Sequence, residues 1–384
     1  MELIFSQLLD GLSIGSVLLL AATGLAIVFG LMGVINLAHG ELIMLGAYTT
    51  YVVQMVFKLP AFQPIYSLYV LVAIPLAFVV SGVVGILLER TVIRRLYGSP
   101  LETLLATWGV SLILQQFVRS VPLAHAAGLI LALVLGFGLP LVLPQRLFEG
   151  PKARINRAIT WAVSAFGGVL LAGGLASQIS RIARATSRNV DVTAPKWMRG
   201  GIEWMDITFP VPRLVIIVMT ILAVLGVTWF LNRSVWGMRI RAVTQNRSMS
   251  DCLGIPTDTV DVLTFGIGSG LAGVAGVAVS LLGSVGPNVG GSYIVGCFMV
   301  VVLGGVGNLL GTVLASFAIG LLTDLIGAGR LLTIWPEMPA PLAGAVNFFA
   351  TTSMAQVLVF ALIVVFLQFR PAGLFPQKGR MVEA

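Results

Sequence analysis

Apolar residues dominate long stretches of the chain that contain no Asp, Glu, Lys or Arg. These charge-free stretches are 11–40, 59–88, 120–145, 158–180, 214–232, 262–323 and 338–369. A helix needs about 20 apolar residues to cross a bilayer, so most stretches fit one crossing and the longest fits about two or three. The pattern predicts spanning helices at 9–31, 42–57, 66–88, 102–119, 123–143, 159–179, 214–231, 259–283, 293–306, 309–327 and 353–369.

The composition indicates the same class of protein. Of the 384 residues, 58% are hydrophobic and 10% are charged, and the mean hydropathy is +1.01. Soluble domains carry about 25% charged residues, so a soluble globular protein, a disordered chain and a coiled coil are excluded. We therefore predict an all-α polytopic membrane protein with about 9 to 11 transmembrane helices.

Positive charge lies in short segments between the apolar stretches, and the net charge is +8. Basic loops of a membrane protein set its orientation, so we expect no nucleic-acid partner. Four basic segments fall on one side of the predicted topology: 89–100, 144–158, 232–258 and the tail from Arg370. The positive-inside rule makes that side cytoplasmic, which predicts an N-terminus outside and a C-terminus inside. The basic loop 180–213 is the one segment that disagrees, and its tryptophans suit an interfacial element.

An internal repeat relates two parts of the chain. Residues 14–33 and 267–286 share Ile, Gly, Ser, Leu, Ala, Gly and Gly at an offset of 253 positions. Each copy runs into a polar, glycine-rich break and then into another short apolar run. The predicted topology sends the copies across the membrane in opposite directions. This is an inverted repeat with two broken helices, an arrangement typical of transporters.

The two breaks have two readings. Unwound backbone is tolerated at membrane depth only where protein buries it or water reaches it, so the breaks are expected to line a solute pathway. Alternatively, their glycines only allow helices to pack closely. Close packing is also the expected role of the helical glycines Gly11, Gly15, Gly24, Gly30, Gly266, Gly270, Gly273 and Gly276.

Five polar residues at the breaks are candidates for the substrate pathway: Asn36, His39, Glu41, Asn288 and Ser292. A carboxylate inside an apolar stretch is costly, so Glu41 marks a cavity, a partner or a helix end. His39 and Glu41 could form a pair that caps the broken helix or relays protons. The amides of Asn36 and Asn288 could bind an uncharged solute or satisfy the broken backbone.

The polar segment 238–258 joins two spans on the basic side and ends in Gly254-Ile255-Pro256. It reads either as a solvated connecting helix or as a docking helix for a cytoplasmic partner. Elsewhere no Gly-Lys pair of a phosphate-binding loop, no metal-site motif and no nucleophile–His–acid set occurs. We therefore expect neither enzymatic activity nor a bound metal.

Several segments resemble the permeases of ABC importers of the branched-chain amino acid transport family. The resemblance rests on Gly33-Val-Ile-Asn-Leu-Ala-His-Gly-Glu-Leu42, Arg241-Ala-Val-Thr-Gln-Asn-Arg247 with Cys252-Leu-Gly-Ile-Pro256, Val302-Leu-Gly-Gly-Val-Gly-Asn-Leu309, and Arg370-Pro-Ala-Gly-Leu-Phe-Pro376. With Ala106-Thr-Trp-Gly-Val-Ser-Leu-Ile-Leu-Gln-Gln116, the pattern is similar to the urea-transporting branch of that family. The resemblance covers most of 8–120 and 186–376, whereas the hairpin 121–180 is extra and 328–352 is longer than usual.

The resemblance implies one transmembrane permease domain over 1–384 in a bacterial inner membrane. Its parts are the first repeat about 8–120, the hairpin 121–180, the outer loop 180–213, the coupling loop 232–258, the second repeat about 259–369 and the tail 370–384. The partners would be a second, different permease subunit, two ABC ATPase subunits and a periplasmic solute-binding protein, besides membrane lipid. ATP would bind the ATPase subunits and no cofactor would bind this chain. The residues that couple it to the ATPases would be Arg241, Gln245, Asn246, Arg247, Gly254 and Ile255.

The solute and the energy source stay open at this point. Urea or a short amide is the first expectation, and a branched-chain amino acid is the alternative within the family. An ion-coupled secondary transporter would also use inverted repeats but needs an intramembrane carboxylate, for which Glu41 is the candidate. A passive urea channel is the remaining alternative.

Overall fold

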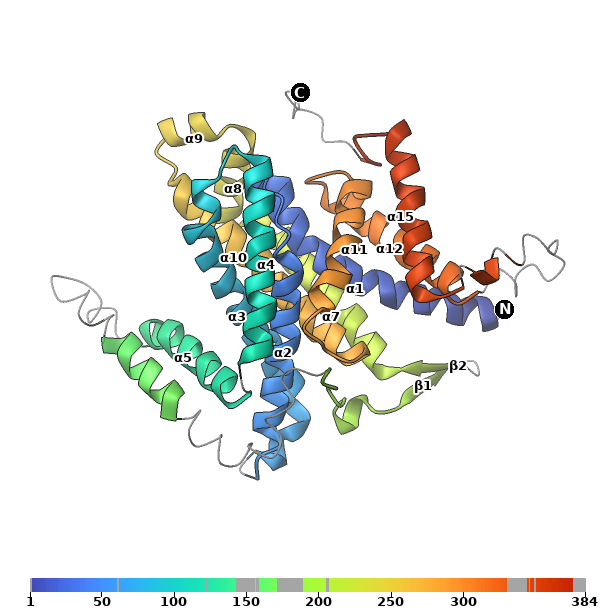
Figure 1. Ribbon diagram of the computed structural model, residues 1–384, viewed down its shortest axis with the longest axis horizontal. Coiled ribbons are helices and arrows are strands. Elements are labelled where there is room, and N and C mark those ends of the chain that lie inside the picture. Colours follow the sequence, from blue (N-terminus) through green and yellow to red (C-terminus); the bar gives the residue numbers. More distant parts are fainter. Residues whose placement is uncertain are drawn as a thin grey trace.

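The computed structural model describes residues 2–60, 62–121, 123–142, 156, 159–170, 189–204, 207–329, 344, 346–348 and 350–375. Over these residues the fold is nearly all helical, as predicted (Figure 1). The α-helices are α1 Glu2–Met32, α2 His39–Phe57, α3 Tyr69–Thr91, α4 Pro100–Ser120, α5 Leu123–Val142, α7 Val211–Arg233, α8 Val235–Gln245, α9 Arg247–Cys252, α10 Thr257–Leu282, α11 Val289–Gly304, α12 Leu309–Gly327 and α15 Thr352–Phe369. Short 3-10 helices are η1 Gln63–Leu68, η2 Ile93–Arg95 and η5 Lys196–Met198.

Every span predicted from the sequence overlaps an apolar helix, and residues 171–179 of the predicted span 159–179 lie outside the described residues. Six helices of the described part are long and apolar enough to cross a membrane: α1, α3 with its flanking 3-10 turns, α4, α7, α10 and α12. The remaining predicted spans coincide with α2, α5, Ile159–Leu170, α11 and α15. The polytopic helical class is therefore confirmed.

Two helices form the centre of the bundle. In their most apolar windows, 78% of α1 and 83% of α10 is buried, against 17% of α4 and 22% of α7. Helices approach closely in a membrane where small residues face each other. A Cβ on Gly24 of α1 would collide with the carbonyl of Gly268 on α10, and a Cβ on Gly46 of α2 would collide with Gly273. The expected packing role of the helical glycines is borne out at all eight positions, where an added Cβ would meet a neighbouring element.

Three basic segments lie at one end of the bundle, which we call the basic end. Arg94 after α3 forms an ion pair with Asp258 at the start of α10. Helices α8 and α9 and the last turn of α15 lie at the same end (Figure 1). The predicted basic segment 144–158 lies outside the described residues, apart from Asn156. The other three basic segments lie at the same end of the bundle, as the prediction of membrane orientation from the positive-inside rule requires.

The loop predicted on the other side covers the opposite end, where it adds a feature that the sequence did not predict. Strands β1 Gly201–Trp204 and β2 Ile207–Pro210 form an antiparallel ribbon with Trp204 opposite Ile207. The preceding segment is tied to the helices, because Gln54 Nε2 donates to the carbonyl of Thr193 at 2.8 Å and Trp197 Nε1 donates to the carbonyl of Ser67 at 2.6 Å. The long segment predicted at 328–352 lies mostly outside the described residues.

Candidate functional site

The first break folds back into the bundle between α1 and α2. It begins at Gly33, whose φ of 68° lies in the left-handed region that glycine adopts without strain. Asn36 is fully buried, and its Oδ1 accepts from the backbone N–H of Ala38 at 3.0 Å. The ring of His39 lies against the middle of α1, with Nε2 3.1 Å from the carbonyl oxygen of Ala21. Helix α2 therefore begins about 16 Å back along α1 from its end at Met32, well inside the bundle.

Glu41 lies in the first turn of α2 and is 1% exposed. Its Oε1 accepts hydrogen bonds from Ser111 Oγ at 3.0 Å and from Gln115 Nε2 at 2.7 Å, both on α4. His39 instead contacts α1, so the two side chains that were candidates for a pair bond to different helices. A carboxylate in the first turn also complements the helix dipole.

The second break joins α10 to α11 and is held by the outer segment. Val285 exchanges two backbone hydrogen bonds of 2.8 Å with Val190, which satisfies part of the unwound backbone. Asn288 precedes α11 without capping it. Its Oδ1 accepts from Arg119 Nη2 of α4 at 2.7 Å. Ser292, one turn later, is exposed and lines a cavity of about 660 Å³ whose walls come from α1, the end of α10, α11, α12 and α15.

The two re-entrant helices meet at their first turns. A Cβ on Gly40 of α2 would collide with the carbonyl of Gly290 on α11, and one on Gly290 would lie 2.5 Å from the carbonyl of Gly40. Helix α2 runs from this contact toward the ribbon end, whereas α11 runs toward the basic end (Figure 1). The structure therefore brings the first turns of the helices that follow the two breaks into contact. The equivalent caps, Ala38 and Asn288, are offset by 250 positions, not by the 253 of the sequence match.

The sequence predicted α4 as a membrane span at 102–119, but it did not predict that this helix contacts both breaks. One face of α4 carries polar residues at every fourth position: Thr103, Thr107, Ser111, Gln115 and Arg119. Thr107 Oγ1 accepts from the N–H of Leu37 in the first break at 3.2 Å. The next members bond Glu41, and Arg119 bonds Asn288, so the stripe follows both breaks in turn. The four-residue spacing was the signal, because it puts these side chains on one helix face.

The predicted coupling segment folds into two short helices at the basic end, α8 and α9, followed by the turn at Gly254. We call this segment the elbow. Ser234 caps α8 by accepting from the N–H of Gly237, and Asn246 caps α9 by accepting from the N–H of Met249 at 2.9 Å. Gly254 ends the segment with a φ of 76°, and no neighbouring atom lies near its missing Cβ. The stop predicted at Gly254 is thus a left-handed turn after α9.

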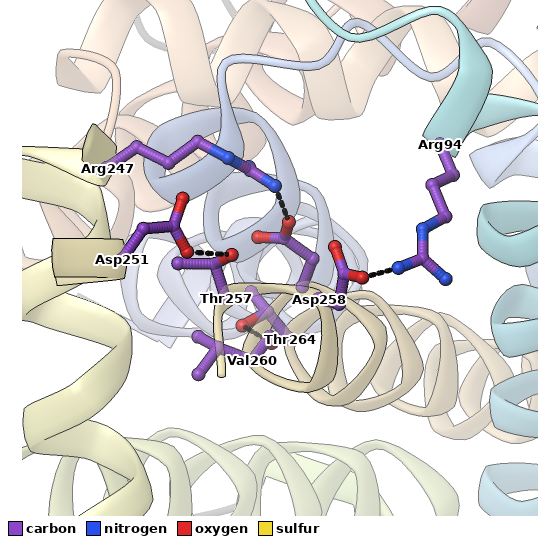
Figure 2. Close-up of polar contacts among 8 residues, drawn as sticks. Arg94, Arg247, Asp251, Thr257, Asp258, Val260 and Thr264 are labelled. Atoms are coloured by element: carbon purple, nitrogen blue, oxygen red, sulfur yellow. Dashed lines mark hydrogen bonds and ion pairs between the residues drawn. The ribbon is translucent and has the colours of Figure 1, made fainter. Parts of the chain in front are cut away.

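Polar contacts fasten α9 to the start of α10 (Figure 2). Arg247 Nη2 lies 2.6 Å from Asp261 Oδ2, and its guanidinium stacks 5.0 Å from the ring centroid of Tyr97. Thr257 Oγ1 donates to Asp251 Oδ1 at 2.7 Å. We call the contacts made by Arg247, Asp261, Tyr97, Asp251 and Thr257 the α9 clamp. Burial raises the pKa of Tyr97, so its hydroxyl stays neutral.

The predicted coupling residues divide into two groups. Arg247 and Asn246 act within the chain, as the clamp and the cap, and Arg241 donates to Asn232 Oδ1 at 2.9 Å. Gln245 and Gly254 are exposed and Ile255 is partly buried. Beside them Met249 and Leu253 of the same elbow are 58% and 74% exposed. These apolar side chains are not among the predicted residues, and they give the elbow an apolar surface at the basic end.

Two further motif segments meet at the basic end. Leu374 N–H donates to the carbonyl of Leu303 at 2.8 Å. A Cβ on Gly373 would lie 2.9 Å from the backbone nitrogen of Gly305, and both glycines have φ above 70°. The segments after α11 and after α15 therefore pack through their glycines. No group of three or more His, Cys, Asp or Glu residues suited to a metal ion occurs in the described part of the chain.

Two helices that return into a bundle of membrane-length helices define a multi-pass membrane protein. The chain belongs to the branched-chain amino acid transport permease family, because the model of the family described as branched-chain amino acid transport system / permease component matches residues 7–367. No solved structure matches the chain.

Relatives extend over nearly the whole chain. The high-affinity branched-chain amino acid transport system permease protein BraD of Pseudomonas aeruginosa is 26% identical over 96% of this chain and 94% of its own length. The permease LivH of Escherichia coli K12, named for the same transport system, is 26% identical with the same coverage of each chain. The autoinducer 2 import system permease protein LsrC of Yersinia pestis matches only 32% of this chain. These relatives are transport permeases and not enzymes, and their names give no support to the expected urea branch.

Proposed function

We propose that the chain is the membrane-spanning permease subunit of an ATP-driven importer of a branched-chain amino acid, in the inner membrane of a bacterium. The observation that carries this proposal is the family match over 7–367, together with relatives of that name aligned over 94% of their own length. Urea, the first expectation from the sequence, becomes the competing solute.

The proposed importer contains a second, different permease subunit, two ABC ATPase subunits and a periplasmic binding protein. ATP binds and is hydrolysed on the ATPase subunits, and no cofactor binds this chain. The exposed elbow of α8 and α9, with Gln245, Gly254 and Ile255, docks on an ATPase, and Arg241 supports it from α8. The apolar surface of Met249 and Leu253 supports this assignment because both side chains are exposed at the basic end.

The solute passes the region where α2 and α11 meet, beside Asn36, His39, Glu41, Asn288 and Ser292. The support is that unwound backbone of both repeats lies there, with buried polar groups of the first repeat and the exposed Asn288 of the second. Ser292 adds a hydroxyl to the cavity of about 660 Å³, whose walls are otherwise mostly apolar. A small solute with an aliphatic side chain fits such walls.

Uptake by vesicles that contain the whole importer tests the proposal. We expect uptake of L-leucine that requires ATP on the side of the membrane where the ATPase subunits lie. This uptake should persist when the proton gradient is collapsed. Uptake that ignores ATP and disappears with the proton gradient would establish the secondary transporter instead. ATP-dependent uptake of urea but not of leucine would show that urea is the solute. Calorimetric titration of the binding protein with each solute checks that result independently.

A double variant tests the docking elbow. Gly254→Arg adds a bulky charge at a left-handed turn, and Arg241→Glu reverses a charge on α8. Together they should leave ATP hydrolysis intact but lower the solute moved per ATP. Unchanged uptake would contradict docking at this elbow.

A further inference from the structure

The polar stripe of α4 runs beside both breaks although α4 is the least buried of the candidate spans. The opposite face of the helix carries large exposed apolar residues, among them Leu105, Trp108 and Ile113. Polar groups on a membrane helix face protein or water, because lipid cannot satisfy them. Ser111 and Gln115 are satisfied by Glu41. Arg119, the charged member of the stripe, makes no hydrogen bond to Glu41, so its place on the helix needs another explanation.

Arg119 is exposed, and its described partner is the neutral amide of Asn288. Among the ion pairs of the described residues, none joins Arg119 directly to a carboxylate, although Glu41 lies close enough to interact with its charge. An arginine one residue from the end of a spanning helix often extends toward lipid headgroups. Here the guanidinium is instead directed at the second break, since Nη2 lies 2.7 Å from Asn288 Oδ1.

Asn288 is available for this contact because its side chain does not cap α11. By contrast, Asn308 and Asn246 precede their helices and do cap them, accepting from Gly311 and Met249. Asn288 and Arg119 thus place an amide nitrogen and several guanidinium N–H donors together at the ribbon end of the pathway. A guanidinium has five donors, and Asn288 Oδ1 accepts from only one nitrogen of it.

We propose that Arg119, held by Asn288, is a solute-binding residue that donates hydrogen bonds to an acceptor oxygen of the solute. This inference rests on the proposed function and specifies one chemical contact within it. The acceptor is the carboxylate of an amino acid or the carbonyl oxygen of a neutral amide such as urea. A guanidinium binds a carboxylate through two parallel hydrogen bonds, which adds charge to geometry.

Three variants separate charge from hydrogen bonding in the vesicle assay. Arg119→Gln keeps amide donors without the charge, and Arg119→Lys keeps the charge. Gln116→Ala, at an exposed position on the neighbouring face of α4, is the matched control. For L-leucine we expect Arg119→Gln to raise KM by about 10- to 100-fold, with Arg119→Lys and the control much closer to the parent. For urea, Arg119→Gln should act less than Arg119→Lys.

The result that overturns the inference is an unchanged KM in Arg119→Gln for whichever solute the parent complex transports. If the parent complex transports neither solute, the proposed function fails, and a labelling experiment still decides the inference. In that experiment Arg119→Cys is made with Cys252→Ser, because Cys252 is exposed, while the buried Cys297 is kept. An anionic methanethiosulfonate should label Cys at 119, and saturating solute should slow that labelling but not labelling of Gln116→Cys. Equal labelling with and without either solute would refute a solute contact.

Discussion

The α9 clamp gives a local stability that can be calculated from its contacts and measured. In Arg247→Gln, Asp261 loses an ion pair with an Nη2–Oδ2 distance of 2.6 Å while its side chain is only 5% exposed. Polar contacts to a charged group contribute about 1.5–3 kcal/mol, and the stacking on Tyr97 at 5.0 Å adds about 0.5–1 kcal/mol. Because Arg247 is itself 43% exposed, solvent screens part of the interaction. We therefore expect α9 to be held less firmly by about 2 kcal/mol, a factor of about 30 in its opening equilibrium.

Amide hydrogen exchange followed by mass spectrometry measures this opening directly. The reporting amides are those of Ser250, Leu253 and Ile255, which donate within or after α9. In Arg247→Gln their exchange should become about 30-fold faster in the regime where opening precedes exchange. The control is Arg241→Gln, which removes another exposed guanidinium that bonds a neutral asparagine and should leave these amides within about 2-fold.

A double-mutant cycle decides whether the clamp is the cause. If Arg247 acts through Asp261, then Arg247→Gln made on Asp261→Asn should have less than half of its effect, since the neutral amide no longer needs a cation. Additive effects of the two substitutions would refute the reasoning, as would unchanged exchange in Arg247→Gln. The same vesicles used for uptake add a functional readout, in which the single variant should move less solute per ATP.

Three further substitutions test the breaks and the elbow. Gly40→Ala should lower the stability of the purified protein by about 1–3 kcal/mol because its methyl group meets the carbonyl of Gly290, whereas Gly291→Ala, with open space beside it, should change it by less than about 0.5 kcal/mol, both read as thermal unfolding. Glu41→Leu leaves its two α4 donors unpaired and should cost about 2–6 kcal/mol, while Glu41→Gln retains an acceptor oxygen and should cost less; equal melting temperatures would contradict the α4 contacts. Gly254→Ala should strain the turn after α9 by about 1–2 kcal/mol and lower the solute moved per ATP, without changing ATP hydrolysis.

The helical elements were predictable because a lipid environment restricts which sequences can cross it. A membrane span must be apolar and long, so the stretches that became α1, α10 and α12 stand out from charge alone. The breaks were predictable as well, since Gly33-to-Glu41 and Gly286-to-Ser292 interrupt such stretches with polar residues. The position of the first break within the bundle was not predictable. The start of α2 lies beside Ala21 because of contacts between helices, which hydropathy does not report.

The candidate site was only partly predictable for a similar reason. Asn36, His39 and Glu41 attracted attention because polar groups in an apolar run are conspicuous. The α4 residues that bond them were overlooked because α4 is a less apolar span, in which Ser111 and Gln115 look ordinary unless their four-residue spacing is counted. Arg247 was predicted to contact a partner subunit. The sequence could not show that its guanidinium instead forms an ion pair with Asp261, fourteen positions away in the same chain.

These contacts form a continuous route between the elbow and both breaks. The α9 clamp joins the elbow to the first turns of α10, and α10 continues without interruption to Leu282 at the second break. That break is tied to α4 through Asn288, and α4 is tied to α2 through Glu41. We therefore expect a shift of α10 along its axis to move the meeting point of α2 and α11, because the close glycine contacts there leave little free space to absorb it. Loss of the α9 clamp would interrupt these contacts at α9, so we expect Arg247 to influence the proposed solute pathway without touching it.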